Sequence, residues 1–433
     1  MVKRVYFHID EVARDSVVAA NLKRVLAARG IELVYGNRPS SRFLPRVCPF
    51  DALVLPTVQF VQAVAPDPTA PMPPMIVLPT EGIGGIPEDP KRAALKFLGD
   101  PFMAGDRRWV EKVAAFCLWG KQQLIGFEQF APHLADRCHV IGHPRFDRRC
   151  LPRPRPRAAS GDGTVRIGLL TRYSMLNPFD GRTALTYVHS ARRSKFHHIQ
   201  LQPDPTLDIE DLYFTNVSDL RVTFDLIDRL DPQRHRVALR IHPREDRTHW
   251  EALAAAQRLP ISIAPWDQPF IHWLEEVDWM VAPPSTSFYD AFVMGKPVVC
   301  IDRIAPKRKA HVLPLSDDSS RIIDYTFRPK SLDELMALIA RPPAGPVELS
   351  APVATLLAND AHYPECGRSL DALADVCELV MRAHPVEQRA SESLRYGLLT
   401  AVDGLRQRRM VDQGAWFRLD RGRRRWIDGL AAV

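Results

Sequence analysis

The chain has 433 residues, of which 46% are apolar, and a formal net charge of +7. This length predicts two or three domains, and the apolar content is sufficient for two buried cores. No apolar run reaches the roughly 20 residues that a membrane-spanning helix needs, and the first residues do not resemble a signal peptide. We therefore expect a protein of the cytosol. Seven scattered cysteines predict neither a disulfide framework nor a zinc site.

The first 148 residues alternate between strand-like and helix-like segments. Short apolar runs predict strands at residues 5–9, 31–35, 52–55, 75–78, 115–118 and 139–141. Amphipathic stretches predict helices at residues 15–28, 90–98, 109–113 and 122–134. Such alternation is typical of a parallel, doubly wound sheet, so we expect an α/β domain of the Rossmann type over residues 1–148.

A glycine-rich loop follows the fourth predicted strand. Glu81 lies there beside Gly82, Gly84 and Gly85. Glycines let the backbone approach a ligand closely, and a carboxylate on such a loop is a candidate general acid or base; a simple tight turn is the alternative. The glycine spacing matches neither the P-loop nor the dinucleotide fingerprint, which argues against ATPase and dehydrogenase activities.

Residues 149–163 are dense in proline, arginine and glycine and predict a linker. A second alternating series starts at residues 165–170, so we expect a second Rossmann-like domain over residues 164–385. Two such domains would face each other across a cleft. Residues 386–433 would form C-terminal helices that return to the first domain and a basic tail.

Asp204 lies between two prolines in a polar stretch of the second half. A carboxylate held rigidly against an anomeric carbon can act as the nucleophile of a retaining glycosyl transfer, which passes through a covalent adduct. Asp208 is the alternative nucleophile, and an ordinary polar surface loop is the alternative interpretation of the whole stretch.

His242 and Arg244 directly follow the predicted strand at residues 237–241. Pro243 favours an extended backbone at His242, so the imidazole should be directed away from the end of the strand. A donor in this position could bind a phosphate and stabilise a departing nucleotide, and the guanidinium of Arg244 would add a second donor. A histidine that caps a loop is the alternative.

Hydroxyl side chains follow the next central strand, at residues 279–282, and precede a helix. Ser285, Thr286 and Ser287 could cap this helix, or bind a phosphate together with its free N–H groups. Asp290, on the first turns of the helix, could accept hydrogen bonds from a ribose. Lys307, in a basic run after the following strand, could reach a nucleotide phosphate. Solvated residues are the alternative for Asp290 and Lys307.

The order of four motifs resembles that of the bacterial capsule and O-antigen Kdo transferases, which are GT-B glycosyltransferases of surface carbohydrate biosynthesis. The motifs are Pro79-Thr80-Glu81-Gly82-Ile83-Gly84, Gln200-Leu201-Gln202-Pro203-Asp204, His242-Pro243 and the turn from Ser285 to Asp290. The resemblance implies a GT-B fold, with an acceptor domain first and a donor domain second. It also implies a CMP-activated sugar acid, Kdo, as the donor and a surface glycan or glycolipid as the acceptor. Asp204, Glu81 and His242 are the expected catalytic residues.

The last thirty residues are rich in arginine and contain three aromatic residues. They include Arg406, Arg408, Arg409, Arg418, Arg421, Arg423, Arg424, Arg425, Trp416, Phe417 and Trp426. Basic and aromatic residues together suit an anionic membrane surface, so we expect peripheral association with the inner face of the inner membrane; a solvated tail is the alternative. No nucleic-acid-binding motif accompanies them.

No Asp-x-Asp motif follows a predicted strand, and the histidines lack zinc spacing, so we expect a mechanism without metal or cofactor. Two alternatives to sugar-acid transfer stay open. One is an enzyme of the same architecture, either a CDP-polyol phosphotransferase or a nucleotide-sugar epimerase. The other is a non-catalytic, membrane-associated scaffold of a polysaccharide assembly complex.

Overall fold

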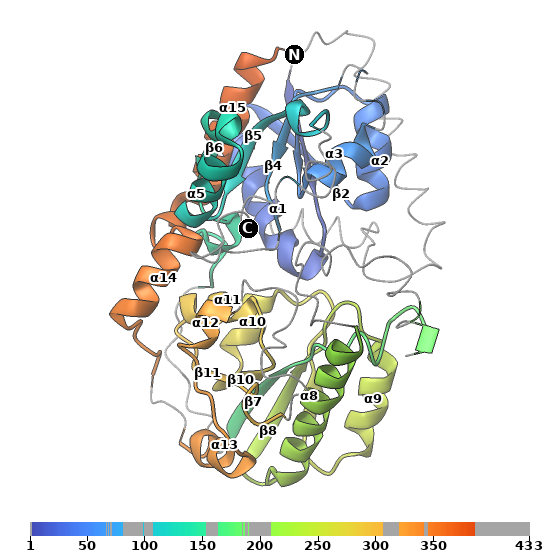
Figure 1. The fold of residues 1–433 in the computed structure, drawn as a ribbon, viewed down its shortest axis with the longest axis vertical. Helices are drawn as coiled ribbons and strands as arrows, with labels where there is room; N and C mark the ends of the chain where they lie inside the picture. The colour runs from blue at the N-terminus through green and yellow to red at the C-terminus, as the bar shows by residue number, and fades with distance from the viewer. Residues whose placement is uncertain are drawn as a thin grey trace. The chain divides into compact units, whose positions relative to one another are not determined.

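The computed structural model contains two α/β units, which are described separately (Figure 1). The first unit comprises Met1–Leu151 and Ala354–Val433, and the second comprises Pro152–Val353. The structure describes residues 2–65, 72–80, 107–152, 163–183, 209–305, 320–341 and 345–385, together with Asp67, Thr69, Leu98, Leu185, Thr186 and His189.

A six-stranded parallel sheet forms the centre of the first unit, with strand order β2-β1-β3-β4-β5-β6. The strands are β1 (Lys3–His8), β2 (Ile31–Gly36), β3 (Ala52–Leu55), β4 (Met75–Val77), β5 (Val113–Leu118) and β6 (Cys138–Val140). The first and last residues of each strand lie within two residues of the predicted bounds, so the six predictions are confirmed. Their apolar residues are buried because helices cover both faces of a parallel sheet.

The helices of the first unit follow the predictions less closely. They are α1 (Val12–Ala27), α2 (Arg38–Val47), α3 (Val58–Val64), α5 (Lys121–Phe130), α14 (Ala351–Ala361) and α15 (Ser369–Ala383). The sequence did not predict α2, which contains Pro45, or α3, which has only seven residues. The helix expected at residues 109–113 is a single 3-10 turn, Val110–Lys112. The helix expected at residues 90–98 lies outside the described residues except for Leu98.

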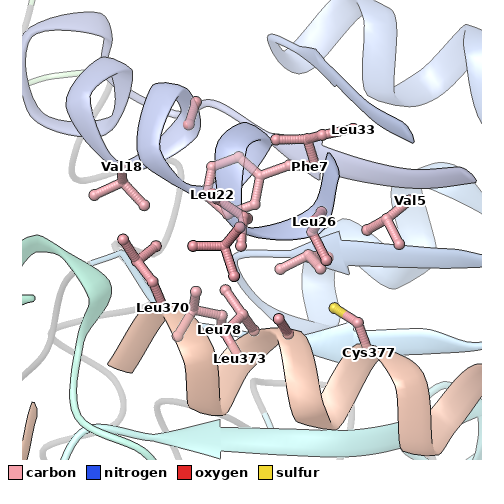
Figure 2. Packing of buried hydrophobic residues seen from close by; sticks show 14 of the residues in the cluster. Val5, Phe7, Val18, Leu22, Leu26, Leu33, Leu78, Leu370, Leu373 and Cys377 are labelled. Carbon is pink, nitrogen blue, oxygen red and sulfur yellow. The ribbon is translucent and has the colours of Figure 1, made fainter. Parts of the chain in front are cut away.

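One face of the first sheet is covered by α1 and α15, which are far apart in the sequence (Figure 2). Leu22 and Leu26 of α1 are fully buried, as are Leu370 and Leu373 of α15. They form one apolar cluster with Val5 of β1. The hydrophobic effect therefore holds α15 on the first sheet.

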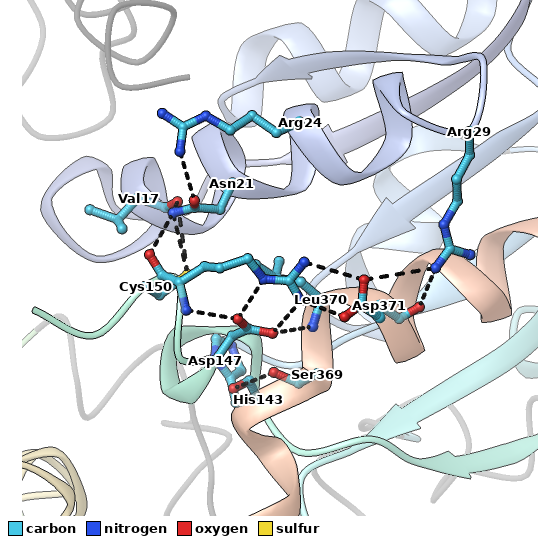
Figure 3. A network of polar contacts seen from close by, with 11 residues as sticks. Val17, Asn21, Arg24, Arg29, His143, Asp147, Cys150, Ser369, Leu370 and Asp371 are labelled. Carbon is cyan, nitrogen blue, oxygen red and sulfur yellow. Dashed lines mark hydrogen bonds and ion pairs between the residues drawn. The ribbon is translucent and has the colours of Figure 1, made fainter. Parts of the chain in front are cut away.

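A buried carboxylate links the chain after β6 to the start of α15 (Figure 3). Asp147 is 0% exposed, and it accepts hydrogen bonds from the guanidinium of Arg149 at 2.9 Å and from the N–H of Leu370 at 2.9 Å. Arg149 also pairs with Asp371 at 2.6 Å. These contacts place α15 in the first unit, whereas the sequence pattern assigned residues 164–385 to the second domain. An amphipathic helix does not itself indicate which sheet it covers.

A five-stranded parallel sheet forms the centre of the second unit, with strand order β11-β10-β7-β8-β9. The strands are β7 (Val165–Leu170), β8 (His235–Arg240), β9 (Ile261–Ile263), β10 (Trp279–Ala282) and β11 (Val298–Cys300), and the helices are α8 (Ile209–Arg229), α9 (Arg247–Ala256), α10 (Phe270–Glu275), α11 (Ser287–Val293), α12 (Ser320–Ile323) and α13 (Leu332–Ile339). The four strands predicted in this half are confirmed.

The strand order reverses at β7, the central strand of the second sheet. From β7 the chain adds β8 and then β9 on one side, and afterwards adds β10 and β11 on the other side. The carboxyl ends of β7 and β10 therefore flank the position where open α/β sheets bind ligands. Within the described ranges, no helix combines the length and apolar character needed to span a membrane.

Candidate functional site

The ends of β7 and β10 are joined by an arginine. Arg172 follows β7, and its guanidinium donates a hydrogen bond to the carbonyl oxygen of Pro284, in the turn after β10. Arg172 is half-buried. This contact places a permanent positive charge at the point where the strand order of the second sheet reverses, which suits an anionic ligand.

His242 lies at the end of β8, next to the same point. Its N–H donates to the hydroxyl of Thr171 at 2.9 Å, and its ring Nδ1 accepts from the N–H of Arg244 at 3.2 Å. Because Nδ1 is an acceptor, the neutral imidazole carries its proton on Nε2, so Nε2 is the donor. His242 is half-buried and Arg244 is exposed.

The hydroxyl cluster after β10 forms the start of α11. Ser285 Oγ accepts from the N–H of Ser287 at 3.2 Å, and the N–H of Phe288 donates to the Ser285 carbonyl oxygen at 3.3 Å. The N–H of Tyr289 donates to the Thr286 carbonyl oxygen at 3.2 Å. These three amides, which we expected to be free for a phosphate, are thus hydrogen-bonded within the turn. The half-buried hydroxyl side chains are candidate donors of this cluster.

Asp290 lies on α11, as expected, but it is only 5% exposed. The loop after β7 is attached to the loop after β8. The N–H of Asp246 donates to the carbonyl oxygen of Asn177 at 2.9 Å, and the side-chain amide of Asn177 donates to the carbonyl oxygen of Asp246 at 2.8 Å. The two loops therefore form one structural unit.

Sequence reasoning missed Glu245, although it belongs to the strand-end run that contains His242. Glu245 is 4% exposed and accepts hydrogen bonds from the N–H of Tyr173 at 2.7 Å and from the indole of Trp250 at 2.8 Å. Burial raises the pKa of Glu245 to about 7, although these hydrogen bonds favour the charged form. The sequence shows an acidic residue after a strand but gives no sign that it is buried.

The first unit contains a second His-Pro-Arg turn, at the end of β6. Nδ1 of His143 accepts from the N–H of Arg145 at 3.1 Å, much as in the turn of His242. His143 is 2% exposed, however, and its ring lies 4.3 Å from the ring of Trp119. Burial lowers the pKa of His143, so this ring is neutral at pH 7.

Glu81, Asp204, Asp208 and Lys307 lie outside the described residues, so their expected roles stay predictions. The C-terminal tail also lies outside them. His242 and Arg244 follow β8, while Ser285, Thr286 and Ser287 follow β10, so the two groups lie at the carboxyl ends of the strands on either side of β7; Asp290 lies on α11. In the described part of the chain, no group of three or more acidic, histidine or cysteine residues could hold a metal ion.

The fold is that of the GT-B class, with two Rossmann-like domains built on parallel sheets, and this expectation is confirmed. No family model matches the sequence, and no curated protein matches it. The likeness to solved structures, at 8% to 11% identity, shows the fold alone.

Three solved structures illustrate this likeness. MnaA of S. aureus, solved with UDP, is 8% identical, with a TM-score of 0.50 over 89% of this chain and 99% of that one. A putative UDP-N-acetylglucosamine 2-epimerase from Listeria monocytogenes is 9% identical, with a TM-score of 0.50 over 90% and 99% of the two chains. A variant of the wall teichoic acid polymerase TagF, soaked with CDPG, is 11% identical, with a TM-score of 0.51 over 88% and 90%.

Proposed function

We propose that this protein is an enzyme that binds a pyrimidine-nucleotide-activated sugar or polyol and transfers the activated group during assembly of a surface glycan. One observation carries the proposal: Arg172, His242 and the Ser285 hydroxyl lie at three strand ends around the point where the second sheet reverses its order. The UDP in MnaA and the CDPG soaked into TagF, which share this fold, support a pyrimidine nucleotide as the donor.

In the proposed reaction, the leaving nucleotide gains negative charge as the bond to the transferred group breaks. The guanidinium of Arg172 and Nε2 of His242 would donate charge-assisted hydrogen bonds to its phosphate, and they would bind more strongly as that charge develops. Arg244, Thr286 and Ser287 complete the proposed phosphate contacts. Asp290, as the ribose contact, and Lys307, as a further phosphate contact, belong to the same proposal.

The identity of the nucleotide donor is also part of the proposal. Binding experiments distinguish the possible donors. A polyol phosphotransferase would bind CDP-glycerol more tightly than CMP, whereas the sugar-acid transferase implied by the sequence resemblance would prefer CMP-Kdo. Isothermal calorimetry of the purified full chain with CMP, UDP, CDP-glycerol and CMP-Kdo would rank them. Absence of binding to all four would contradict the proposal and favour a non-catalytic scaffold.

If the donor is a sugar acid, we propose a retaining transfer with Asp204 as nucleophile and Glu81 as general acid/base. Two displacements at the anomeric carbon need one ionised carboxylate and a second group that shuttles a proton. Asp204→Asn should then abolish transfer and leave nucleotide binding intact, whereas Asp208→Asn, which changes the alternative nucleophile, should retain transfer. Mass spectrometry should find the sugar-acid adduct on the peptide that contains Asp204; an inverted product would exclude this mechanism.

A nucleotide-sugar epimerase is the second candidate function. The favouring observation is that this chain matches 99% of the Listeria UDP-N-acetylglucosamine 2-epimerase chain but 90% of the TagF chain. NMR of UDP-N-acetylglucosamine incubated with the protein and no acceptor would reveal a change of configuration at C2. An unchanged spectrum, together with transfer to a glycan acceptor, would rule out the epimerase.

A further inference from the structure

Among the residues that the structure describes, the second unit exposes one tryptophan, and it lies at the carboxyl edge of the sheet. Trp266 is 44% exposed, whereas the other five tryptophans that the structure describes are at most 4% exposed. It lies three residues after the end of β9. Single exposed apolar residues are common on protein surfaces, so exposure alone does not indicate a site. The surroundings of Trp266 give the exposure its meaning.

The turn that carries Trp266 is held by two arginines. The carbonyl oxygen of Ala264 accepts a hydrogen bond from the guanidinium of Arg247 at 2.8 Å. The carbonyl oxygen of Pro265 accepts one from the guanidinium of Arg240 at 3.4 Å. The backbone directly before Trp266 is therefore fixed, and an indole presented from a fixed backbone loses less conformational entropy when it binds a ligand.

Trp266 also lies beside the proposed phosphate contacts in the order of the strands. β9 is the neighbour of β8, which ends before His242, and β8 is the neighbour of β7, which ends before Arg172. Neighbouring strands are about 4.8 Å apart, so one strand spacing separates the end of β8 from the end of β9. In a nucleotide, the ribose between the phosphate and the base spans a gap of this size.

The chain after Trp266 leads toward the proposed ribose contact. It enters α10, and α10 packs against α11, which carries Asp290. The hydroxyl residues Ser285 and Thr286 directly precede α11. Trp266, the ribose contact and the phosphate contacts therefore occur on neighbouring elements of one half of the second unit.

We propose that Trp266 stacks on the pyrimidine base of the activated donor. This assignment rests on the proposed function. Aromatic side chains bind bases by stacking, and every base has a π-face, so stacking adds affinity without selecting one base over another. Trp266 thus contributes equally to the binding of cytidine and uridine nucleotides, and it contributes nothing to the binding of a sugar phosphate that has no base.

The test measures the affinity of the full chain for CMP, UDP and ribose 5-phosphate by calorimetry. Trp266→Ala should weaken the binding of CMP and of UDP about tenfold, which is the loss of one stacked base. Trp266→Phe, which keeps an aromatic face, should recover most of this affinity. Binding of ribose 5-phosphate should be the same in all three proteins.

Tyr325→Ala is the matched control, because Tyr325 is exposed to a similar degree, 41%, at another place. It precedes Phe327, which pairs in parallel with Val299 of β11, so it lies toward the amino end of that strand. Its affinities should equal those of wild type. A stacked base also quenches indole fluorescence, so CMP should quench wild type and Tyr325→Ala but leave Trp266→Ala unchanged.

Equal CMP affinity of wild type and Trp266→Ala would overturn the assignment, as would an equal loss for ribose 5-phosphate, since that loss could not come from the base. If Trp266→Ala does not fold, Trp266→Leu provides the same test, because it keeps apolar volume but has no aromatic face. Wild-type protein that binds ribose 5-phosphate as tightly as CMP would exclude base stacking alone. Wild-type protein that binds none of the three compounds would contradict the proposed function itself.

Discussion

At the scale of single residues, His242 is oriented before any ligand arrives. Its backbone N–H is bonded to Thr171 and its Nδ1 accepts from Arg244, so both the position and the tautomer of the imidazole are determined by the protein. A donor held in this way loses little conformational entropy when it binds a phosphate.

His242→Ala should therefore weaken nucleotide binding by about 1–3 kcal/mol, because the phosphate would lose one charge-assisted hydrogen bond in a half-buried position. Calorimetry with CMP and with UDP would measure the difference. His133→Ala, which changes an exposed histidine of the first unit, is the control and should bind as wild type does. Equal affinities of all three proteins would remove His242 from the site.

Glu245 should give the second domain a characteristic dependence of stability on pH. Its pKa is raised from 4.5 to about 7, so its contribution is greatest below pH 4.5 and is lost as the pH rises through 7. The wild-type free energy of unfolding, relative to that of Glu245→Gln, should fall by about 3 kcal/mol over this range. Urea titrations at several pH values would measure it; a constant difference would show that Glu245 is not buried in this way.

The two His-Pro-Arg turns show what a sequence can predict about a site. The proline and the strand before it predict the backbone of both turns, and Nδ1 of the histidine is an acceptor in both. The surroundings differ because Trp119 covers His143, whereas His242 lies at the reversal point of its sheet. Those contacts join residues that are distant in the sequence, so local patterns could not distinguish the turns.

At the scale of secondary structure, strands were easier to predict than helices. A strand of a parallel sheet is buried on both faces, so β3 and β10 appear in the sequence as short, fully apolar runs. The helices α2 and α3 are short and depend on caps from Asn37 and Thr57 and on packing against the sheet. Packing of this kind leaves no periodic signal in a segment of two or three turns.

The packing of α15 allows a sharp test with two leucines of one helix. Leu373 is 0% exposed in the core of the first unit, whereas Leu379 is 48% exposed. Leu373→Ala should destabilise the protein by about 2–5 kcal/mol because it removes buried apolar area and leaves a cavity. Leu379→Ala should change stability by less than about 0.5 kcal/mol. Thermal and urea unfolding would measure both, and equal effects would contradict the packing of α15 on the first sheet.

At the scale of the whole molecule, the basic tail remains a prediction of the sequence. Deletion of residues 412–433 should reduce binding to anionic vesicles and leave transfer to a soluble acceptor unchanged, since each basic residue near such a surface contributes about 1 kcal/mol. Co-sedimentation with vesicles that contain anionic lipid would measure binding, and neutral vesicles are the control. Equal binding by the full and shortened chains would refute membrane association through the tail.

Because α15 packs on the first sheet, it also determines the order in which the two units can fold during synthesis. During synthesis, the first sheet leaves the ribosome without the helix that covers Val5, Leu22 and Leu26, and that helix emerges only after the entire second unit. The second unit, being continuous in sequence, can fold while the first still has an apolar face exposed. A nascent chain released before α15 would therefore contain a folded second unit and a first unit with an exposed, aggregation-prone apolar face, so only a chain synthesised through α15 can bury both cores.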